Sequence, residues 1–402
     1  MRRRAAPLFL LLGLLALGCP PAGQQVKPDD DKGTTQLEET KVTPAKGDPC
    51  TGKGTYDAGE LAGVGEVAFK AKNYERSAAC FAMLIDEFPE DERVPVGLFN
   101  LGLSEENLTK FREAEAHFRR LIDEFPNDEA VPDAELRLGF ALMKQEKYDE
   151  AKKIYKTIAA PPDAPWFDKI EALTQVGVCY LKTKRYTVAE EYFWQAIHTY
   201  KRAVRLDEYV DTYALAQIHF YRAGIKESLM LETALEAPKD DSMEEKTRVF
   251  KKLDEKCKWL LDSQYDYIRT IRLGHSHWAT AAGYKIGSLY EALFDAMVNV
   301  PKPESFDAEE AQVYEEELKK KVAVLLKKSL AAFRKVCKVA DRIRVQNEWV
   351  DKSRKSLDRL EKMLTEVQKA GAPPPPPEEK KDESEDSSET QPTAAAWDQS
   401  PG

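Results

Sequence analysis

Four glycines recur along the middle of the chain at nearly constant separation, and this periodicity constrains the fold more than any other feature. Gly65, Gly102, Gly139 and Gly177 are 37, 37 and 38 residues apart. A repeat of this length indicates one supersecondary unit copied along the chain. Because a single unit cannot bury its own apolar face, we expect neighbouring units to stack around a continuous core.

The same residue types follow each glycine. A small residue stands twelve positions later, at Ser77, Ala114, Ala151 and Ala189. Aromatic residues stand three positions before and four positions after each small residue: Tyr74, Phe111, Tyr148 and Tyr186, then Phe81, Phe118, Tyr155 and Phe193. Small residues let helix axes cross closely and aromatics fill the adjoining space, so each unit is predicted to be two antiparallel helices. The low glycine content, 20 in 402 residues, agrees with helices rather than a β-sandwich.

The pattern resembles the tetratricopeptide repeat (TPR). The family signature of Leu-Gly followed by Tyr, Ala, Phe and Pro is matched at Leu101-Gly102 and Leu138-Gly139, by the residues above, and by Pro89 and Pro126 between units. The usual Trp at the fourth position is missing. The resemblance covers residues 56–205 as four repeats and implies an all-α, TPR-like right-handed solenoid of helical hairpins that binds proteins. The turn between units is similar to that of repeat lipoproteins of bacterial outer-membrane assembly and of Tol-Pal coordinators.

Residues 206–370 keep helical periodicity but lose the repeat spacing, so we expect additional, degenerate helical repeats there. Five helices are predicted, over 207–224, 242–271, 278–299, 307–340 and 347–370. Ile286-Gly287 followed by Tyr290 repeats the first half of the motif and predicts a fifth unit with a long second helix. Short segments around Pro301, Gln312 and Asn347 are weakly similar to large deltaproteobacterial repeat proteins, some of them tied to gliding.

The amino terminus has the pattern of a leader. Arg2, Arg3 and Arg4 precede an apolar run over 5–17, which is shorter than the roughly 20 residues that a helix needs to cross a bilayer. Residues 1–18 are therefore predicted to be a signal peptide.

The end of this leader, Leu15-Ala16-Leu17-Gly18-Cys19, resembles the lipobox of bacterial lipoproteins. The resemblance implies that Cys19 is acylated, that the leader is cut before it, and that the chain is anchored in a membrane. Pro20 stands where Asp would signal inner-membrane retention, so the expected location is the periplasmic side of the bacterial outer membrane. The alternative is a secretory signal with an incidental cysteine.

Both flanks of the helical region are predicted to be disordered. Residues 20–55 contain no aromatic side chain, and residues 371–402 begin with a run of prolines at 373–377 followed by acidic and serine residues. Such segments cannot bury enough apolar surface to fold. Residues 19–55 are thus interpreted as a disordered tether and 371–402 as a disordered, Pro-rich acidic tail.

The sequence predicts no catalytic residues, no metal site and no cofactor. His275 and His277 form the one histidine cluster, but residues two apart on a helix point away from each other. Five cysteines follow Cys19, with none of the close spacings of metal ligands: Cys50, Cys80, Cys179, Cys257 and Cys337. Two of them could form a disulfide, and Cys50 and Cys80 are the nearest in sequence; buried thiols are the alternative.

Charge is distributed unevenly along the chain. The net charge of −10 argues against generic nucleic-acid binding, which needs a strongly basic face. Residues 319–362 nevertheless hold 15 Lys or Arg against 5 Asp or Glu. This basic stretch fits anionic lipid headgroups or cell-wall polymers, or else the acidic repeat region or the chain's own tail.

The resemblance to TPR proteins implies that the first helix of each unit lines a concave groove. The predicted groove residues are Phe99, Leu103, Asn107, Phe140, Met143, Lys144 and Lys182. The family's clamp for a carboxyl-terminal peptide is not matched, since Ala62 and Glu66 occupy two of its positions. An apolar groove rimmed by lysines indicates a helical or extended peptide with hydrophobic anchors, unless later helices or the tether cover these residues.

Together these patterns predict a membrane-anchored, non-enzymatic TPR scaffold that binds proteins of a bacterial envelope complex through its concave face. One alternative is a component of a gliding-motility or surface-polysaccharide apparatus. Another is an enzyme whose repeat domain is followed by an unrecognised helical catalytic part within residues 206–370.

Overall fold

The computed structural model describes residues 49–51, 56–239, 242–301 and 308–369. The predicted signal peptide, Cys19, most of the tether and the acidic tail lie outside the described residues. The described part is helical throughout, with a short 3₁₀ helix η2 (Pro49–Thr51) before the α-helices. These are α1 (Ala58–Lys70), α2 (Tyr74–Glu87), α3 (Val94–Asn107), α4 (Phe111–Glu124), α5 (Val131–Lys144), α6 (Tyr148–Ala159), α7 (Trp166–Lys182), α8 (Tyr186–Arg205), α9 (Thr212–Glu232), α10 (Met243–Arg272), α11 (Ser276–Val298), α12 (Ala308–Ile343) and α13 (Glu348–Lys369).

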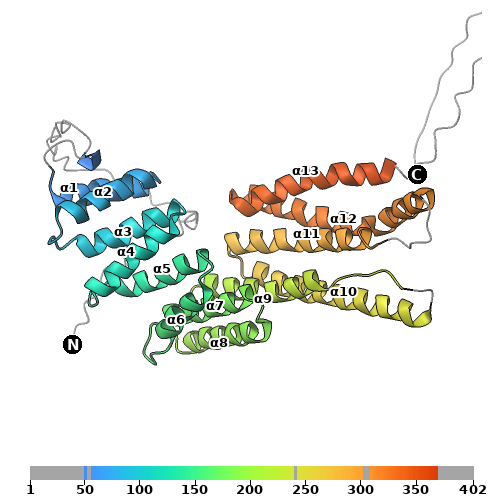
Figure 1. Ribbon diagram of the computed structural model, residues 1–402, viewed down its shortest axis with the longest axis horizontal. Helices are drawn as coiled ribbons and strands as arrows, with labels where there is room; N and C mark the ends of the chain where they lie inside the picture. Colours follow the sequence, from blue (N-terminus) through green and yellow to red (C-terminus); the bar gives the residue numbers. More distant parts are fainter. Residues whose placement is uncertain (1–48, 52–55, 240–241, 302–307, 370–402) are drawn as a thin grey trace, which may run out of the picture.

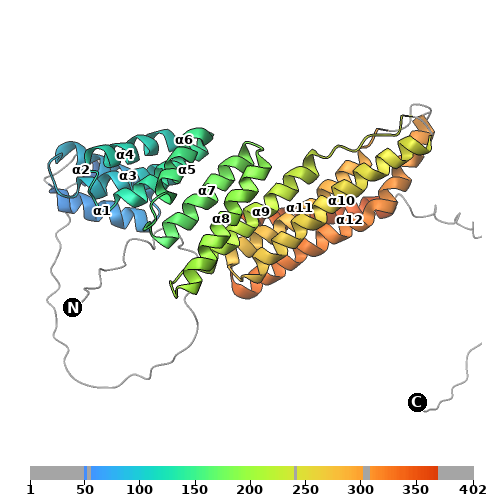
Figure 2. The ribbon, with the colours of Figure 1, turned by 90° about the horizontal axis from the view of Figure 1, so that it is seen from below.

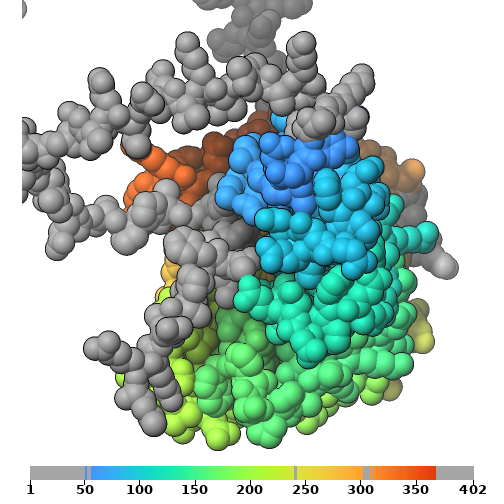
Figure 3. Space-filling model, turned by 90° about the vertical axis from the view of Figure 1, so that its left-hand side faces the viewer, coloured from blue at the N-terminus to red at the C-terminus, as the bar shows by residue number. Residues whose placement is uncertain are grey.

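Consecutive helices pair as hairpins, and the hairpins stack in chain order. Figure 1 shows a curved row that descends from α1 and α2 to α7 and α8 and rises again through α11, α12 and α13. Figure 2 shows that the hairpins of the second half are longer than those of the first, and Figure 3 looks onto the row from its α1–α2 end. Odd-numbered helices also contact the next odd-numbered helix, for example α7 with α9 and α9 with α11. The predicted all-α array of helical hairpins is therefore confirmed.

The turn inside each of the first four hairpins has one backbone geometry. Lys72, Thr109, Glu146 and Lys184 adopt left-handed φ values between 59° and 61°. Each lies seven residues after its repeat glycine, so the turns keep the register seen in the sequence. After the turn between hairpins, α3 and α5 each have a proline in the first helical turn. A backbone N–H at this position has no partner within the helix, so proline loses no hydrogen bond there.

Each repeat glycine faces the ring of the aromatic residue that follows the small residue of its unit. A Cβ atom added to Gly139 would lie 2.5 Å from the Cζ atom of Tyr155, and one added to Gly102 would lie 2.6 Å from Phe118. Tyr155 is only 1% exposed and Phe118 is fully buried. The ring therefore occupies the space that a side chain would take, which explains why glycine stands at these positions.

Two further hairpins of the same design follow the first four. In α11 and α12, Gly287 faces the buried ring of Phe333, and the Ser329 hydroxyl donates to the Gly287 carbonyl at 2.9 Å. This hairpin is the expected degenerate unit, with a second helix of 36 residues.

The hairpin of α9 and α10 was not recognised in the sequence as a unit. The Ser263 hydroxyl donates to the Ala223 carbonyl at 3.0 Å, and Tyr267, four residues after Ser263, is 1% exposed. Ala223 thus stands at the position of the repeat glycine, which removes the signal that marks the other units. The described chain contains six stacked hairpins, and α13 packs against α11 and α12.

The bounds of α9 differ from the prediction of 207–224. The helix begins after Asp211, whose side chain accepts the Tyr213 N–H at 3.0 Å. It continues past Gly224 because Ile225 and the later Met230 are buried.

The end of α9 is held by a buried lysine of the next helix. The ammonium of Lys256 donates to the carbonyls of Met230 and Thr233, at 2.6 Å and 2.8 Å. A cation at this end satisfies carbonyls that have no partner within the helix.

Charged side chains join the first four hairpins to the longer ones. Arg222 and Lys226 of α9 both contact Glu190 of α8 and Asp266 of α10, at N–O distances between 2.7 Å and 3.6 Å. The Asp266 side chain is only 5% exposed. Because these half-buried charges have opposite partners on three helices, they fix how α8, α9 and α10 meet.

One pair of cysteines forms a disulfide, between Cys50 of η2 and Cys80 of α2. The sequence left this pairing open. Cys179 is a buried free thiol, and Cys257 and Cys337 are half-buried free thiols.

Candidate protein-binding face

The odd-numbered helices α3, α5 and α7 carry the predicted groove residues. We call the partly exposed surface of these three helices the odd-helix face. Phe99 does not belong to it: its side chain is 7% exposed and packs on Phe118, with ring centroids 6.0 Å apart. Leu103 is half-buried, and Asn107 is exposed, its side chain donating to the Leu103 carbonyl. Phe99 is thus a core residue rather than an exposed anchor, because the second helix of its own unit supplies an aromatic ring against it.

The structure brings three predicted groove residues of α5 together. Phe140 and Met143 are half-buried and Lys144 is exposed. The Lys144 ammonium lies 5.0 Å from the centroid of the Phe140 ring, and the centroids of the Phe140 and Phe111 rings are 6.4 Å apart. Lys182 is exposed at the end of α7. Lys144 therefore lies beside the apolar side chain of Phe140 on α5.

Four carboxyl groups on the same helices were not singled out by the sequence. Glu106 of α3, Asp133 of α5 and Glu171 of α7 lie around the guanidinium of Arg137, and Asp168 of α7 lies near Asp133. We call these four carboxyl groups the acidic cluster. Arg137 Nη1 lies 3.1 Å from Glu106 Oε1, and the two side chains are 18% and 10% exposed. No single stretch of sequence shows this cluster, because its members come from three helices.

Burial shifts the ionisation of all four groups. It raises the pKa of Glu106 above its usual value despite the charge of Arg137. Burial also raises the pKa of Asp133 and of Asp168, and the negative charge of Asp133 raises the pKa of Asp168 further. The pKa of Glu171 is raised by burial as well. Nearby positive charge thus offsets only part of the free-energy cost of burying these carboxylates.

Two amides lie beside the cluster. Gln175 donates to Glu171 Oε1 at 2.7 Å, and the Gln217 amide nitrogen lies 3.5 Å from the same oxygen. Gln217 is 5% exposed, and its Oε1 atom has no hydrogen-bond partner among the described residues; the same holds for Glu106 Oε2. Both unpaired atoms are acceptors, and burying an acceptor without a donor is unfavourable by about 1–3 kcal/mol.

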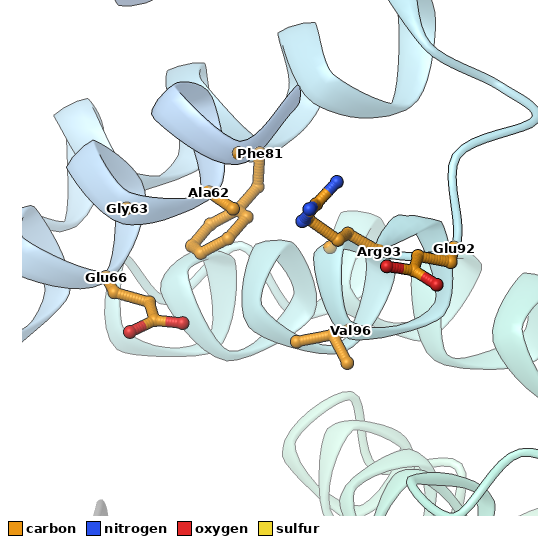
Figure 4. Close-up of a pocket in the computed structure, with 9 residues that line it drawn as sticks. Ala62, Gly63, Glu66, Phe81, Glu92, Arg93 and Val96 are labelled. Atoms are coloured by element: carbon orange, nitrogen blue, oxygen red, sulfur yellow. The ribbon is translucent and has the colours of Figure 1, made fainter. Parts of the chain in front are cut away.

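A hollow lies at the end of the row, between α1 and α3. It has a volume of about 480 Å³, and Gly59, Ala62 and Gly63 form one wall. Figure 4 shows the Phe81 ring beside this wall, with Glu66 and Arg93 at the rim. Arg93 is already engaged, since its Nη1 atom lies 3.0 Å from both carboxylate oxygens of Asp91.

The histidine pair and the basic stretch noted in the sequence do not form a further site among the described residues. His275 precedes α11 and His277 lies in its first turn, and the described residues contain no group of three His, Cys, Asp or Glu placed to hold a metal ion. Part of the positive charge of the basic stretch is neutralised by ion pairs within the protein. These pairs are Arg334–Glu361, Arg354–Asp341 and Arg359–Glu291. None of the described helices combines the length and apolarity that a membrane span requires.

Comparisons with known proteins agree with the repeat pattern. Residues 108–165, which span α4, α5 and α6, match the family model of the tetratricopeptide repeat. Comparison with curated proteins gives no match.

Solved structures of helical repeat proteins are similar at low sequence identity. RapI in its apo form is 10% identical, with a TM-score of 0.43 over 79% of this chain and 100% of that chain. The carboxyl-terminal part of a TPR repeat-containing protein from Cytophaga hutchinsonii is 11% identical, with a TM-score of 0.41 over 77% and 98% of the two chains. PilW, a type IV pilus biogenesis factor, is 14% identical, with a TM-score of 0.35 over 64% and 97%. Residues 108–165 of this chain thus match the tetratricopeptide repeat, and the hairpins before and after them pack in the same way.

Proposed function

We propose that this protein is a non-enzymatic scaffold of a bacterial envelope complex, anchored through Cys19 in the outer membrane on its periplasmic side, which binds a protein partner on its odd-helix face. The observation that carries the binding proposal is the surface of α5, where half-buried Phe140 and Met143 lie beside exposed Lys144. Exposed aromatic and apolar side chains ringed by charge are typical of protein-binding surfaces. The stacked hairpins extend this surface over several units, which suits a helical or extended peptide.

The leader and the disulfide support export. The leader ends in a pattern that resembles a lipobox at Cys19, and the Cys50–Cys80 disulfide is favoured in oxidising compartments such as the periplasm. Metabolic labelling with a palmitate analogue tests the anchor. Wild type should be labelled, and Cys19→Ser should remain an unlabelled precursor that keeps its leader. Equal labelling of both would contradict lipidation at Cys19.

Purification of the tagged chain from its native envelope tests the binding face. Replacing Phe140 with Ser and Lys144 with Ala should remove the copurifying partner while the helical circular-dichroism signal stays unchanged. The matched control is Phe250→Ser, because Phe250 is 71% exposed on α10, away from the odd-helix face. Recovery of the partner with the α5 double variant, or its loss with the control, would contradict binding at this face.

The enzyme alternative places an unrecognised helical catalytic part within residues 206–370, and a compact group of strands or a polar pocket there would support it. The described part of that range consists of α9 to α13 and their connections. Helical hairpins with the packing of the preceding repeats support a scaffold role for this region too.

A further inference from the structure

We infer that the segment bound on the odd-helix face is cationic, with arginine or lysine side chains of a separate partner protein seated at the acidic cluster. This inference rests on the proposed function and adds the chemical class of the partner. It follows from three features of Glu106, Asp133, Asp168, Glu171 and their neighbours: missing counter-charges, unpaired acceptors and an adjoining apolar surface.

The first feature is the shortage of positive charge. Arg137 contacts Glu106, whereas Asp133, Asp168 and Glu171 form no ion pair with any described residue. The fold compensates comparable carboxylates elsewhere. Asp266 meets three cations, Arg222, Lys226 and Arg269. Glu190 meets two, and Glu227 pairs with Lys285 at 2.9 Å. The guanidinium of Arg137 also acts on Asp133 and Glu171, so this one cation is shared among three carboxylates. A partly buried group of carboxylates with so little counter-charge is complementary to a cation supplied from outside.

The second feature is the type of the unpaired atoms. Glu106 Oε2 and Gln217 Oε1 are buried acceptors with no donor among the described residues. Gln217 is more than nine-tenths buried, and its amide nitrogen points at Glu171. A ligand that satisfies both atoms must bring N–H groups, not further acceptors. Guanidinium and ammonium groups carry five and three such donors and accept none.

The third feature is the surface that continues from the cluster along α5. Asp133, Leu136, Arg137, Phe140 and Met143 each lie three or four residues from another member of the set, so they share one side of the helix. Leu136, Phe140 and Met143 are half-buried. A partner that reaches the cluster therefore also meets an apolar patch, which fits an amphipathic segment with basic and apolar side chains.

Electrostatics within the free protein point in the same direction. Burial raises the pKa of Asp133 and Asp168, and the charge of Asp133 adds to the shift of Asp168. The two carboxylates therefore destabilise each other, and the charge of Arg137 offsets this at Asp133 but not at Asp168. Two carboxylates that repel each other on an accessible face lower the stability of the protein. Such a pair is expected where the residues serve a function.

Fluorescence anisotropy with fluorescein-labelled octa-arginine tests the inference on the purified full-length chain at low salt. The double variant Asp133→Asn/Asp168→Asn should bind the peptide at least tenfold more weakly than wild type. The control Asp351→Asn/Asp358→Asn removes the same charge from two exposed acids of α13 and should bind like wild type. The cluster variant should also melt no earlier than wild type, since repulsion is removed.

Three results would overturn the inference. If both double variants bind the peptide equally more weakly than wild type, peptide binding depends on net charge alone. Wild-type affinity in the cluster variant would remove the cluster as its site. Concentration-dependent dimers that disappear in the cluster variant would assign the cluster to a basic segment of a second copy. If Phe140→Ser/Lys144→Ala loses the native partner while Asp133→Asn/Asp168→Asn retains it, the cationic inference fails and the proposed function stands.

Discussion

Replacing Gly139 with alanine tests the packing that defines each unit. In a helix interior, alanine is favoured over glycine by about 0.5–1 kcal/mol. At this position the new Cβ atom would lie 2.5 Å from Tyr155 Cζ and 2.8 Å from both Cε atoms. The ring is 1% exposed and cannot swing into solvent. Overpacking of this kind destabilises by roughly 1–3 kcal/mol, so the expected net effect is a destabilisation of about 1–2 kcal/mol.

Gly63→Ala is the matched control. Gly63 lies inside α1, and a Cβ atom added there would meet nothing within 4 Å. The same substitution should therefore stabilise the protein by about 0.5–1 kcal/mol through helix propensity alone. Urea unfolding of both variants, followed by circular dichroism at 222 nm, measures the two free-energy changes. The packing account is refuted if Gly139→Ala is as stable as wild type or shifts in the same direction as Gly63→Ala.

Other expectations follow from burial and from the cysteines. Ala151→Leu should destabilise by roughly 1–3 kcal/mol in thermal melts because Ala151 is fully buried at a helix crossing, whereas exposed Ala160 should tolerate leucine; similar losses at both would show that the register is wrong. Burial raises the pKa of the Cys179 thiol to about 12, so this thiol should react with Ellman's reagent only after unfolding, and fast reaction in the native state would contradict its burial. Cys80→Ser removes the disulfide to Cys50 and should lower the melting temperature of the oxidised protein, whereas an unchanged value would show that the disulfide adds no stability.

The repeat architecture could be predicted from the sequence wherever close packing allows only glycine at a position. Gly139 must lack a side chain because Tyr155 fills the space, and this requirement recurs with the repeat period. At Ala223 the hairpin accepts a small side chain instead, and α10 has 30 residues, so both the glycine and the spacing vanish from the sequence. The sixth hairpin was predictable because Gly287 again faces a ring, that of Phe333.

The exposure of the predicted groove residues could be predicted only in part, because position within a helix does not determine burial. Phe99 stands three residues before Gly102 and Phe140 one residue after Gly139, and both were assigned to the groove. Phe99 is nevertheless enclosed by Phe118 of its own unit, while Phe140 stays half-exposed. The acidic cluster depends on contacts between helices distant in sequence. Asp133 and Asp168 are 35 residues apart and belong to different helices, so their proximity appears only in three dimensions.

Site-specific photocrosslinking in the native envelope tests most directly the central claim that the odd-helix face binds a protein partner. A benzophenone amino acid is placed at half-buried Leu136 of α5 and, in a separate strain, at exposed Lys153 of α6. The account predicts one discrete adduct from position 136, weakened when Asp133 and Asp168 are changed to Asn, and none from position 153. An adduct of equal strength from both positions, or one from position 153 alone, would contradict it.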